Sequence, residues 1–468
     1  MRKTKIIATL GPASFNPEII SKLILNGMDV VRINMSHYDG STDLKSHIDF
    51  IRNEADKQNK GIGIIFDLCG PKIRVGKIAE SSINIIKGNH YTLGVSGCDI
   101  PLNMDISFKS QSSKGLVKIN DGILSFNILK VNNNSLEIVA NESGEIIAGK
   151  GINFPGVTLN LPALTDKDKK DIELAVQLNI DWLAMSFVRT AEDYILINTE
   201  LEKHKMSIPV IAKIEKPEAI TNLGSIIDSF DGILVARGDL GVEMPIKKLP
   251  ILQKKIVNEC LTKRKPVIIA TQILETMINN SSPTRAEVND IANAIYDGAD
   301  AMMLSGETAI GSYPLESVEI MNEIASSIDM DLDIQNFNRY IRQKRRDFQD
   351  IRGAICHSAM ILSNDLNIKN LVIMTETGLT AMKMARYRPK AKIFALCTDV
   401  KVRSQLSLIW GVTPILVRKY STTEKMIQNT GDILKKHNYV SKGELFIITA
   451  GVSAGVSGST NMLKIHEV

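Results

Sequence analysis

The sequence has few of the residues and segments that mark secreted, membrane-spanning or nucleic-acid-binding proteins. Its 468 residues include only five cysteines, which are scattered and form no Cys-x-x-Cys pair, so neither a disulfide framework nor a zinc site is predicted. No apolar run approaches the roughly 20 residues that span a bilayer, and the opening MRKTKIIATLGPAS lacks the apolar stretch of a signal peptide. The 56 basic and 52 acidic residues give a net charge of only +4, which does not indicate a nucleic-acid partner. These absences predict a cytoplasmic protein that binds neither membranes nor nucleic acid.

What the sequence does contain is a series of short apolar, β-branched runs that alternate with helix-like stretches. Continuous apolar runs are typical of parallel strands that are buried on both faces. The eight runs are KIIATLG, DVVRIN, IGIIFDL, DWLAMSF, IPVIAKI, GILVARG, KPVIIAT and ADAMMLSG. Eight strands alternating with helices predict a (β/α)8 barrel. Polar and charged residues follow the runs, and barrel enzymes carry their chemistry at that end of the strands.

The barrel pattern is interrupted once and is followed by a third region, so an α/β protein with three domains is predicted. Residues 1–70 and 163–331 would form the barrel. The insertion at 71–162 has short apolar segments broken by Asn-Asp-Gly, Asn-Asn-Asn and Glu-Ser-Gly turns, which predict an all-β lid domain. Residues 346–468 alternate strand-like and helical segments, which predict an α/β domain with a mostly parallel sheet. The basic run Arg342–Arg346 is interpreted as a solvated helix face rather than a nucleic-acid patch, because acidic residues balance it.

Two segments, AKIEKPE and LVARGDLG, place charged residues directly after predicted strands. The first contains Lys213 and Glu215, and the second contains Arg237 and Asp239. Such charges are costly inside a core, but they suit the mouth of a pocket at which neighbouring parallel strands end. Two carboxylates there can hold a hard divalent cation, and a lysine can face an anionic substrate, which predicts phosphate chemistry. The alternative is that the two carboxylates form ion pairs with neighbouring basic residues.

Eight motifs occur in order along the chain: VVRINMSH, FDLCGPKIRVG, KGINFPG, AKIEKPE, VARGDLG, ATQILETM, PTRAEVNDIANA and MLSGETAIGSYP. Together they resemble the motifs of the pyruvate kinases, and the resemblance runs from residue 3 to the C-terminus. It implies the architecture already predicted, with the C-terminal domain serving effector binding and oligomerisation. It also implies a glycolytic phosphotransferase that moves the phosphoryl group of phosphoenolpyruvate to ADP. Such an enzyme would use Mg²⁺, with Mn²⁺ as an alternative, and would form an allosteric homotetramer.

The resemblance assigns roles to residues at the predicted barrel mouth. Glu215 and Asp239 match the carboxylates that hold the divalent ion, and Lys213 matches the lysine that faces the phosphoryl group and the enolate oxygen. Gly238 and Asp239 begin a predicted helix whose amides would receive the substrate carboxylate. Thr271 matches the threonine proposed to help protonate the enolate. A water chain as the donor, or a purely packed threonine, remains an alternative.

A second set of residues matches positions that contact the phosphates or the nucleotide. Arg32 and Arg74 would grip phosphoryl oxygens in bidentate fashion, and Arg74 lies where the predicted barrel meets the lid. The remaining matches are Pro12, His37 and Lys150. A hydrogen-bonded structural role for His37 is an equal alternative.

The third predicted strand departs from the pattern of family members that need potassium. Those members hold the ion with an Asn, a Ser, an Asp and a backbone carbonyl, and the matching positions here are Asn34, Ser36, Asp67 and Leu68. They carry DTKGPEIRTG where this chain has DLCGPKIRVG, so that Lys72 replaces a glutamate. Its ammonium group would supply the positive charge that potassium supplies elsewhere. Leu68 and Lys72 resemble the potassium-independent branch of the family, and activity without K⁺ is predicted.

The C-terminal region resembles the effector domain of the family. TETGLTAMKMARYRP places four residues at a strand-to-helix turn suited to a phosphate: Thr375, Thr377, Gly378 and Thr380. A second loop near Gly455 and Ser457 would cover them. Because Glu376 would repel a dianion, a sugar monophosphate or AMP is predicted as the activator rather than fructose 1,6-bisphosphate. A capping turn that binds no effector is the alternative.

Two other functions fit the same residues less well. A barrel enzyme of different enolpyruvate chemistry, such as an aldolase or a lyase, would not need Arg74, Lys150 or an ADP site. A non-catalytic sensor of phosphorylated metabolites would be expected to have lost the site, whereas its predicted residues are all present. Dependence of product formation on ADP separates the phosphotransferase from the other barrel enzymes.

Overall fold

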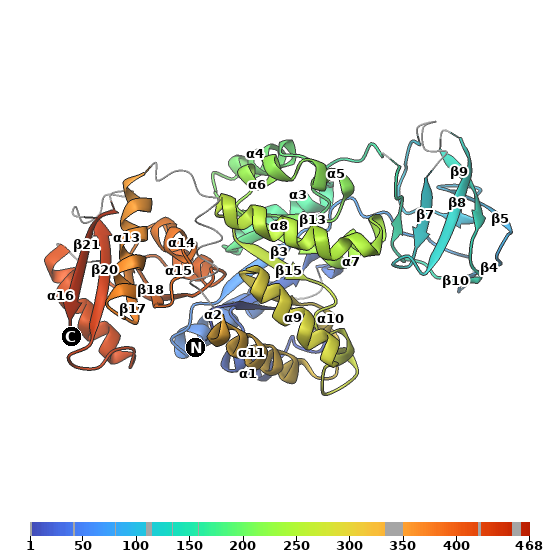
Figure 1. Ribbon diagram of the computed structural model, residues 1–468. Coiled ribbons are helices and arrows are strands. Elements are labelled where there is room, and N and C mark those ends of the chain that lie inside the picture. The colour runs from blue at the N-terminus through green and yellow to red at the C-terminus, as the bar shows by residue number, and fades with distance from the viewer. Residues whose placement is uncertain are drawn as a thin grey trace.

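The eight predicted runs form one closed parallel barrel at the centre of the molecule (Figure 1). The computed structural model describes residues 2–40, 43–79, 81–108, 115–132, 134–157, 159–332, 350–419, 423–451 and 460–468. Around the barrel the strands are β1 (Lys5–Leu10), β16 (Ala301–Leu304), β15 (Val267–Ala270), β14 (Gly232–Ala236), β13 (Val210–Ile214), β12 (Trp182–Met185), β3 (Gly63–Asp67) and β2 (Val30–Asn34). The predicted (β/α)8 barrel is therefore confirmed.

Helices surround the barrel and begin at recognisable polar caps. Thr165 and Thr284 each form a capping box with an acidic residue three positions later, Asp168 and Glu287. The helices are α1 (Pro17–Asn26), α2 (Leu44–Lys57), α3 (Asp166–Gln177), α4 (Glu192–Lys203), α5 (Pro217–Thr221), α6 (Leu223–Ser229), α7 (Arg237–Glu243), α8 (Leu249–Lys263), α9 (Arg285–Asp297), α10 (Gly306–Ala309) and α11 (Pro314–Asp331). Short 3-10 turns are η1 (Met35–His37), η3 (Ile246–Lys248) and η4 (Glu275–Ile278). No helix in the described part of the chain is both long and apolar enough to cross a membrane.

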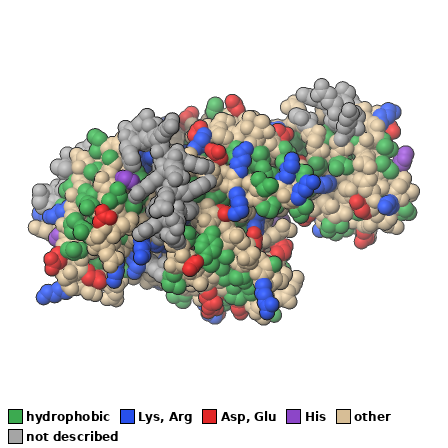
Figure 2. All heavy atoms as spheres, viewed as in Figure 1, with side chains coloured by type: hydrophobic (Ala, Val, Ile, Leu, Met, Phe, Trp, Pro, Cys, Tyr) green, Lys and Arg blue, Asp and Glu red, His purple; other side chains and the backbone are tan. Residues whose placement is uncertain are grey.

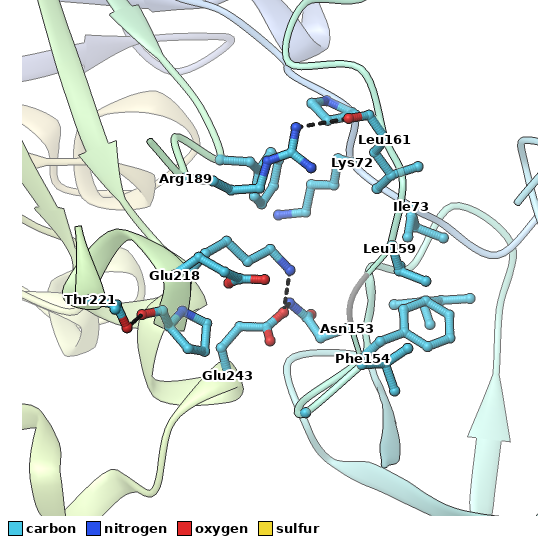
Figure 3. Close-up of a pocket in the computed structure, with 17 residues that line it drawn as sticks. Lys72, Ile73, Asn153, Phe154, Leu159, Leu161, Arg189, Glu218, Thr221 and Glu243 are labelled. Atoms are coloured by element: carbon cyan, nitrogen blue, oxygen red, sulfur yellow. Dashed lines mark hydrogen bonds and ion pairs between the residues drawn. The ribbon is translucent and has the colours of Figure 1, made fainter. Parts of the chain in front are cut away.

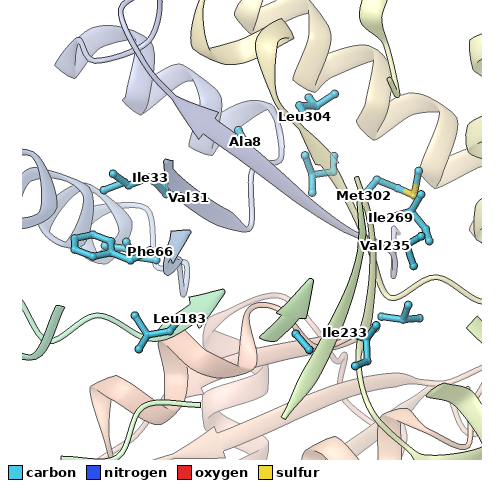
Figure 4. Close-up of a cluster of buried hydrophobic side chains, with 14 of the residues drawn as sticks. Ala8, Val31, Ile33, Phe66, Leu183, Ile233, Val235, Ile269, Met302 and Leu304 are labelled. Atoms are coloured by element: carbon cyan, nitrogen blue, oxygen red, sulfur yellow. The ribbon is translucent and has the colours of Figure 1, made fainter. Parts of the chain in front are cut away.

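The barrel strands are buried on both faces, as their continuous apolar runs predicted. One set of strand residues, which includes Val31, Phe66 and Leu183, packs with the surrounding helices (Figure 4). The alternate residues, such as Ile7 and Ile65, belong to a second cluster that continues without a break into the C-terminal domain. The second set lies on the opposite face because successive strand side chains point in opposite directions. The barrel interior and the C-terminal domain therefore share one core.

The insertion forms the predicted all-β lid domain, which projects from the barrel on the right of Figure 1. Its larger sheet has the order β11 (Ile152–Asn153), β7 (Leu116–Ile119), β8 (Leu124–Val131), β9 (Ser135–Ala140), β5 (His90–Gly94) and β6 (Ile100–Pro101). A smaller sheet pairs β10 (Gly144–Ile146) with β4 (Ile83–Ile85). The predicted Asn-Asp-Gly turn joins β7 to β8, and its residues Asn120, Asp121 and Gly122 all have positive φ, as hairpin turns of this type require.

The C-terminal domain is an α/β layer at the other end of the barrel, on the left of Figure 1. Its sheet has the order β19 (Val412–Leu416), β18 (Lys392–Cys397), β17 (Asn370–Met374), β20 (Leu445–Gly451) and β21 (Thr460–Glu467). Only the β20–β21 pair is antiparallel among these strands, so the mostly parallel sheet is confirmed. Its helices are α13 (Ile351–Asp365), α14 (Leu379–Ala385), α15 (Val400–Leu406) and α16 (Thr423–Lys436). The basic run 342–346 and the loop near Gly455 and Ser457 lie outside the described residues.

This domain docks closely against the amino ends of the barrel strands. The amide of Gly411 donates to the carbonyl of Lys3 at 2.8 Å, and the Lys5 ammonium donates to the carbonyl of Val412 at 2.8 Å. A Cβ atom at Gly63, the first residue of β3, would lie 2.8 Å from the carbonyl oxygen of Ser404. The opposite end of the barrel, where the charged motifs lie, therefore stays open towards the lid.

Candidate active site

Lys213 lies at the centre of the site, near the end of β13. Its ammonium group donates to Ser186 Oγ at 2.7 Å and pairs with Asp67 at 3.1 Å and with Glu215 at 3.0 Å. Burial alone would lower the pKa of Lys213, but the charges of Asp67 and Glu215 outweigh it, so the pKa is raised. The lysine is therefore a fixed cation at the open end of the barrel.

The two carboxylates singled out in the sequence lie beside this lysine. Glu215 accepts a hydrogen bond from the amide of Phe187 at 2.9 Å. Its other oxygen faces Lys213 at 3.0 Å as an ion pair but accepts no hydrogen bond from the described residues. Burial raises the pKa of Glu215, Lys213 opposes that shift, and the negative charge of Asp239 adds to it. Two neighbouring carboxylates that repel each other have the chemistry of a divalent-cation site.

The described residues contain no group of three or more His, Cys, Asp or Glu side chains placed to hold a metal. Magnesium is commonly bound through only one or two carboxylates and completes its shell with water and substrate phosphates. Asp239 is in the first turn of α7, and its side chain is 23% exposed. Glu215 and Asp239 therefore fit a Mg²⁺ or Mn²⁺ ion that is shared with a substrate. The ion-pair alternative is also partly realised, because each carboxylate contacts a lysine.

Arg32 is held against Asp67 across neighbouring strands. Its Nε and Nη2 atoms lie 2.8 and 2.6 Å from Asp67 Oδ2, and Nη1 donates to Thr9 Oγ1 at 3.0 Å. Burial would raise the pKa of Asp67, but Lys213 and Arg32 together lower it. Since a guanidinium carries five N–H donors, Arg32 keeps two for a ligand while Asp67 fixes its orientation.

Thr271 adopts a strained conformation at the end of β15. Its φ is 65°, and Gln272 follows with φ 53°, although β-branched residues rarely adopt positive φ. Arg237 holds the turn, because its guanidinium donates to the carbonyls of both residues at 2.7–3.2 Å. The Thr271 hydroxyl donates to the carbonyl of Ala270 and accepts from the amide of Gly238, both at 2.7 Å. The Gly238 amide, predicted to receive a substrate carboxylate, is thus occupied by Thr271.

Lys72 reaches into the same site from the start of the lid domain. Its ammonium group lies 3.2 Å from Asp239 Oδ1 and 6.0 Å from the centroid of the Phe187 ring. The ammonium of Lys216 lies 5.7 Å from the same ring, so one aromatic ring faces two cations. Lys72 was predicted at the edge of the positions that match a monovalent-cation site, and the structure brings it against Asp239, one of the two predicted metal ligands.

The other residues of the matching potassium positions have partners of their own. Asn34 Oδ1 accepts from the amide of Ser36 at 3.2 Å and thereby caps η1. The carbonyl of Leu68 accepts from Ser186 Oγ at 2.7 Å, and the Leu68 side chain is buried. The Leu68 carbonyl thus helps to hold Ser186, whose hydroxyl in turn accepts from Lys213.

The predicted nucleotide contacts lie on both sides of the opening between barrel and lid. Arg74 pairs with Gly151 in an isolated bridge, and its guanidinium donates to the carbonyl of Gly149 at 3.0 Å, beside Lys150. On the barrel side, Pro12 and His37 are exposed. Desolvation and the charges of Arg74, Arg32 and Lys72 lower the pKa of His37, which is therefore neutral at pH 7. These shared charges show that His37 and the three basic residues face one region.

A cavity of about 300 Å³ lies between the lid and the barrel, beside Lys72 and Phe187. Figure 3 shows its barrel wall, with Arg189, Glu218 and Glu243, opposite the lid-side residues Asn153 and Phe154. Lys and Arg side chains also gather on the surface where barrel and lid meet (Figure 2). The cavity lining carries three basic side chains, Lys72, Arg189 and Lys216, and two acidic ones, Glu218 and Glu243.

Comparison with known proteins identifies this arrangement. Residues 1–318 match the family model for the pyruvate kinase barrel domain, and residues 353–466 match the model for the pyruvate kinase alpha/beta domain. The chain belongs to the pyruvate kinase family. It is therefore a phosphotransferase, as its motifs predicted.

Individual relatives agree with the family assignment over the full chain. A pyruvate kinase from Sporosarcina psychrophila is 38% identical over 477 residues, which cover 100% of this chain and 81% of the relative. One from Staphylococcus epidermidis is 38% identical over 480 residues with the same coverage. The crystal structure of a pyruvate kinase from Cryptosporidium parvum has a TM-score of 0.93 and 33% identity, covering 100% of this chain and 96% of that one.

The predicted effector turn of this chain is well packed. Thr375 Oγ1 accepts from the amide of Gly378 at 2.9 Å, and the Thr380 and Thr460 hydroxyls lie 2.8 Å apart. Thr377 is exposed, whereas Thr375 and Thr380 are buried. Glu376 and Thr377 line a cavity of about 460 Å³ that also receives two further acids, Asp231 and Asp399. The turn is thus held by a hydrogen bond between its own residues, and the three acids line the cavity beside it together with Lys401.

Sequence reasoning gave no role to several residues that organise the site. Ser186 and Phe187 directly follow strand β12. Their place at a strand end, the feature that also drew attention to Lys213, is the one sequence pattern that pointed to them. Asn153, Lys216 and Glu243 meet at one contact between lid and barrel. No sequence pattern marks that contact, because its members come from three separate segments.

Proposed function

We propose that this chain transfers the phosphoryl group of phosphoenolpyruvate to ADP, giving pyruvate and ATP as a step of glycolysis in the cytoplasm. The observation that carries the proposal is the convergence of Lys213, Glu215 and Asp239 at the open end of the barrel. A buried lysine kept protonated by carboxylates can counter the charge that develops on the phosphoryl and enolate oxygens. Pyruvate kinase relatives over the whole chain length support the same reaction.

Glu215 and Asp239 would hold Mg²⁺, or Mn²⁺ in its place. When bound, the ion would supply charge neutralisation between substrate and enzyme oxygens. Lys213 would bind the transferring phosphoryl group, and Ser186 and Asp67 hold its ammonium in position. Arg32, oriented by Asp67, would bind a phosphoryl oxygen through its remaining N–H groups.

Thr271 would help to deliver the proton to the enolate. Its hydroxyl is held between the carbonyl of Ala270 and the amide of Gly238, so it would act with a water rather than alone. Arg237 contributes by fixing the strained turn. The substrate carboxylate would bind at the first turn of α7, after the Gly238 amide exchanges its present partner.

Arg74 and Lys150 would bind the ADP phosphates from the lid, while Pro12 and His37 would contact the nucleotide from the barrel. Arg74 is tied to the lid strand through Gly149 and Gly151. Motion of the lid would therefore move Arg74 towards or away from the substrate. A neutral His37 would add no charge repulsion to the cations already present.

The reaction would not need K⁺, because Lys72 places a fixed ammonium at the site. The contact that supports this is the 3.2 Å pair with Asp239. Leu68 has an apolar, buried side chain, and the hydroxyl of Ser186 occupies the Leu68 carbonyl. Neither group favours a further cation at that position.

A role in regulation and assembly is proposed for the C-terminal domain. A sugar monophosphate or AMP would bind at Thr375, Thr377, Gly378 and Thr380, and the acidic wall with Glu376 disfavours a bisphosphate. A homotetramer and domain limits of 1–70 with 163–331, 71–162 and 346–468 complete the proposal. The separate family matches at residues 1–318 and 353–466 support a boundary before the C-terminal domain, and the tetramer is carried over from the family resemblance alone.

The test is pyruvate formation from phosphoenolpyruvate, ADP and Mg²⁺, in buffers of K⁺ or tetramethylammonium at constant ionic strength. ADP-dependent turnover that is equal in both buffers is expected. Product without ADP would identify a different enolpyruvate enzyme, and turnover only with K⁺ would remove the role of Lys72. Removal of the divalent ion with EDTA should abolish turnover, and Mg²⁺ or Mn²⁺ should restore it.

A further inference from the structure

The lid and the proposed metal site are connected through the far end of helix α7. This helix has seven residues, and Asp239 is the third of them. Its last residue, Glu243, has a side chain that is only 3% exposed. One oxygen of this carboxylate accepts from Asn153 Nδ2 of the lid at 2.8 Å and from Lys216 Nζ at 2.5 Å. Figure 3 shows these side chains meeting across the gap between barrel and lid.

The three partners come from the segments that matter most to the site. Lys216 directly follows Glu215, and Glu243 lies four residues after Asp239. Asn153 is the last residue of the lid strand β11 and is itself buried. One carboxylate oxygen therefore joins the lid to both segments that carry the proposed metal ligands.

A second contact joins the lid to the same end of helix α7. Lys118 of β7 donates to the carbonyl of Val242 at 2.7 Å, and Lys118 is the register partner of Asn153 in the β7–β11 pair. Two opposed lid residues thus hold two consecutive residues of α7. A helix of two turns is short enough that a shift of this end also moves its first turn.

We propose that Glu243 and Asn153 are positioning residues that transmit the orientation of the lid to the metal carboxylates. Neither is among the residues proposed above to contact the substrate or the reacting atoms, although both line the cavity between lid and barrel. Their hydrogen bond sets the position of α7, and with it Asp239, while Lys216 sets the segment that carries Glu215. The inference rests on the proposed metal role of Glu215 and Asp239, and it adds a coupling between nucleotide-side lid motion and ion affinity.

The experiment measures Mn²⁺ binding to the full-length protein by electron paramagnetic resonance, without substrates. Asn153→Ala and Glu243→Ala are each expected to weaken Mn²⁺ binding about threefold to tenfold. The double variant should bind Mn²⁺ at most about twofold more weakly than the more affected single variant, because both substitutions remove the same contact. Asn127→Ala is the matched lid control, since Asn127 bonds only within the lid, to Asn141, and it should bind Mn²⁺ like the unmodified chain.

The outcomes separate this inference from the proposed function. If the Asp239→Asn variant binds Mn²⁺ as tightly as the unmodified chain, the metal assignment is wrong, and the coupling is wrong with it. If Asp239→Asn loses Mn²⁺ but Asn153→Ala binds it normally, the coupling alone is wrong. Effects that multiply in the double variant would also overturn it, because the residues would then act independently. Should Glu243→Ala not fold, Asn153→Ala against Asn127→Ala decides the question alone.

Discussion

Replacing Lys72 is the most direct test of the proposal that its ammonium group takes the place of potassium at the site. Its ammonium lies 3.2 Å from Asp239 Oδ1, and two unit charges at that distance attract by about 5 kcal/mol at an effective dielectric of about 20. The side chains are 26% and 23% exposed, so solvent screening reduces the attraction to about 1–2 kcal/mol. Lys72→Met removes this attraction, and Lys72→Glu replaces it with a repulsion of similar size.

At about 1.4 kcal/mol per tenfold change, Lys72→Met should lower kcat/KM for phosphoenolpyruvate about fivefold to thirtyfold. Lys72→Glu should lower it about thirtyfold to a thousandfold, and K⁺ should then restore activity about tenfold, because a mobile cation can replace the lost ammonium. The assay compares kcat/KM in K⁺ and in tetramethylammonium at constant ionic strength. Lys77→Met, at an exposed lysine five residues away, is the control and should change neither value.

Two results would refute this reasoning. One is an unmodified enzyme whose turnover collapses in tetramethylammonium, because the ammonium of Lys72 would then not be sufficient. The other is a Lys72→Glu variant that is nearly as active as the unmodified chain and indifferent to K⁺, because no monovalent charge would then be needed at this position.

Three further predictions concern stability, proton transfer and regulation. Burial raises the pKa of Asp181 to about 6. The stability that its protonated carboxyl contributes is therefore present below about pH 4 and is lost as the pH rises through 6. Asp181→Asn, which cannot ionise, should raise the free energy of unfolding by about 1–3 kcal/mol at pH 7.5. The gain should shrink at pH 5 in denaturation experiments, and an equal gain at both pH values would contradict it. Thr271→Ala should lower kcat about tenfold to a hundredfold with little change in KM, whereas Thr271→Ser, which keeps the hydroxyl, should stay within about fivefold; equal losses in both variants would indicate a packing role. Calorimetric titration should give heat with AMP or a sugar monophosphate but not with fructose 1,6-bisphosphate, and no heat with any of them would leave the turn at Thr375 as a structural cap.

Much of the barrel and its site could be predicted because both follow from local pattern. The continuous apolar runs predict doubly buried strands, and the charges of Lys213 and Glu215 directly after one of them predict a pocket mouth. Lys72 was singled out by a charge reversal, but its contact with Asp239 depends on how the lid is mounted on the barrel. The sequence contains no measure of that geometry.

The contacts that escaped prediction join segments that are distant along the chain. Glu243 meets Asn153 across 90 residues, and Phe187 lies between Lys72 and Lys216. Apart from Lys72, each of these residues, taken alone, is an ordinary residue at or near the end of a strand or helix. Only the closed barrel and the placement of the lid bring them together.

The core shared by the barrel interior and the C-terminal domain bears on how the chain folds during synthesis. Strand β1 is made first, yet Lys3 donates to the carbonyls of Pro389 and Lys390, and Lys5 donates to that of Val412. Domains made on the ribosome generally fold from the N-terminal end. The interior of this barrel, however, is covered only after the last quarter of the chain has been made. A chain that stops before β18 would therefore leave the amino ends of the barrel strands uncovered and prone to aggregate, although every proposed catalytic residue had already been synthesised.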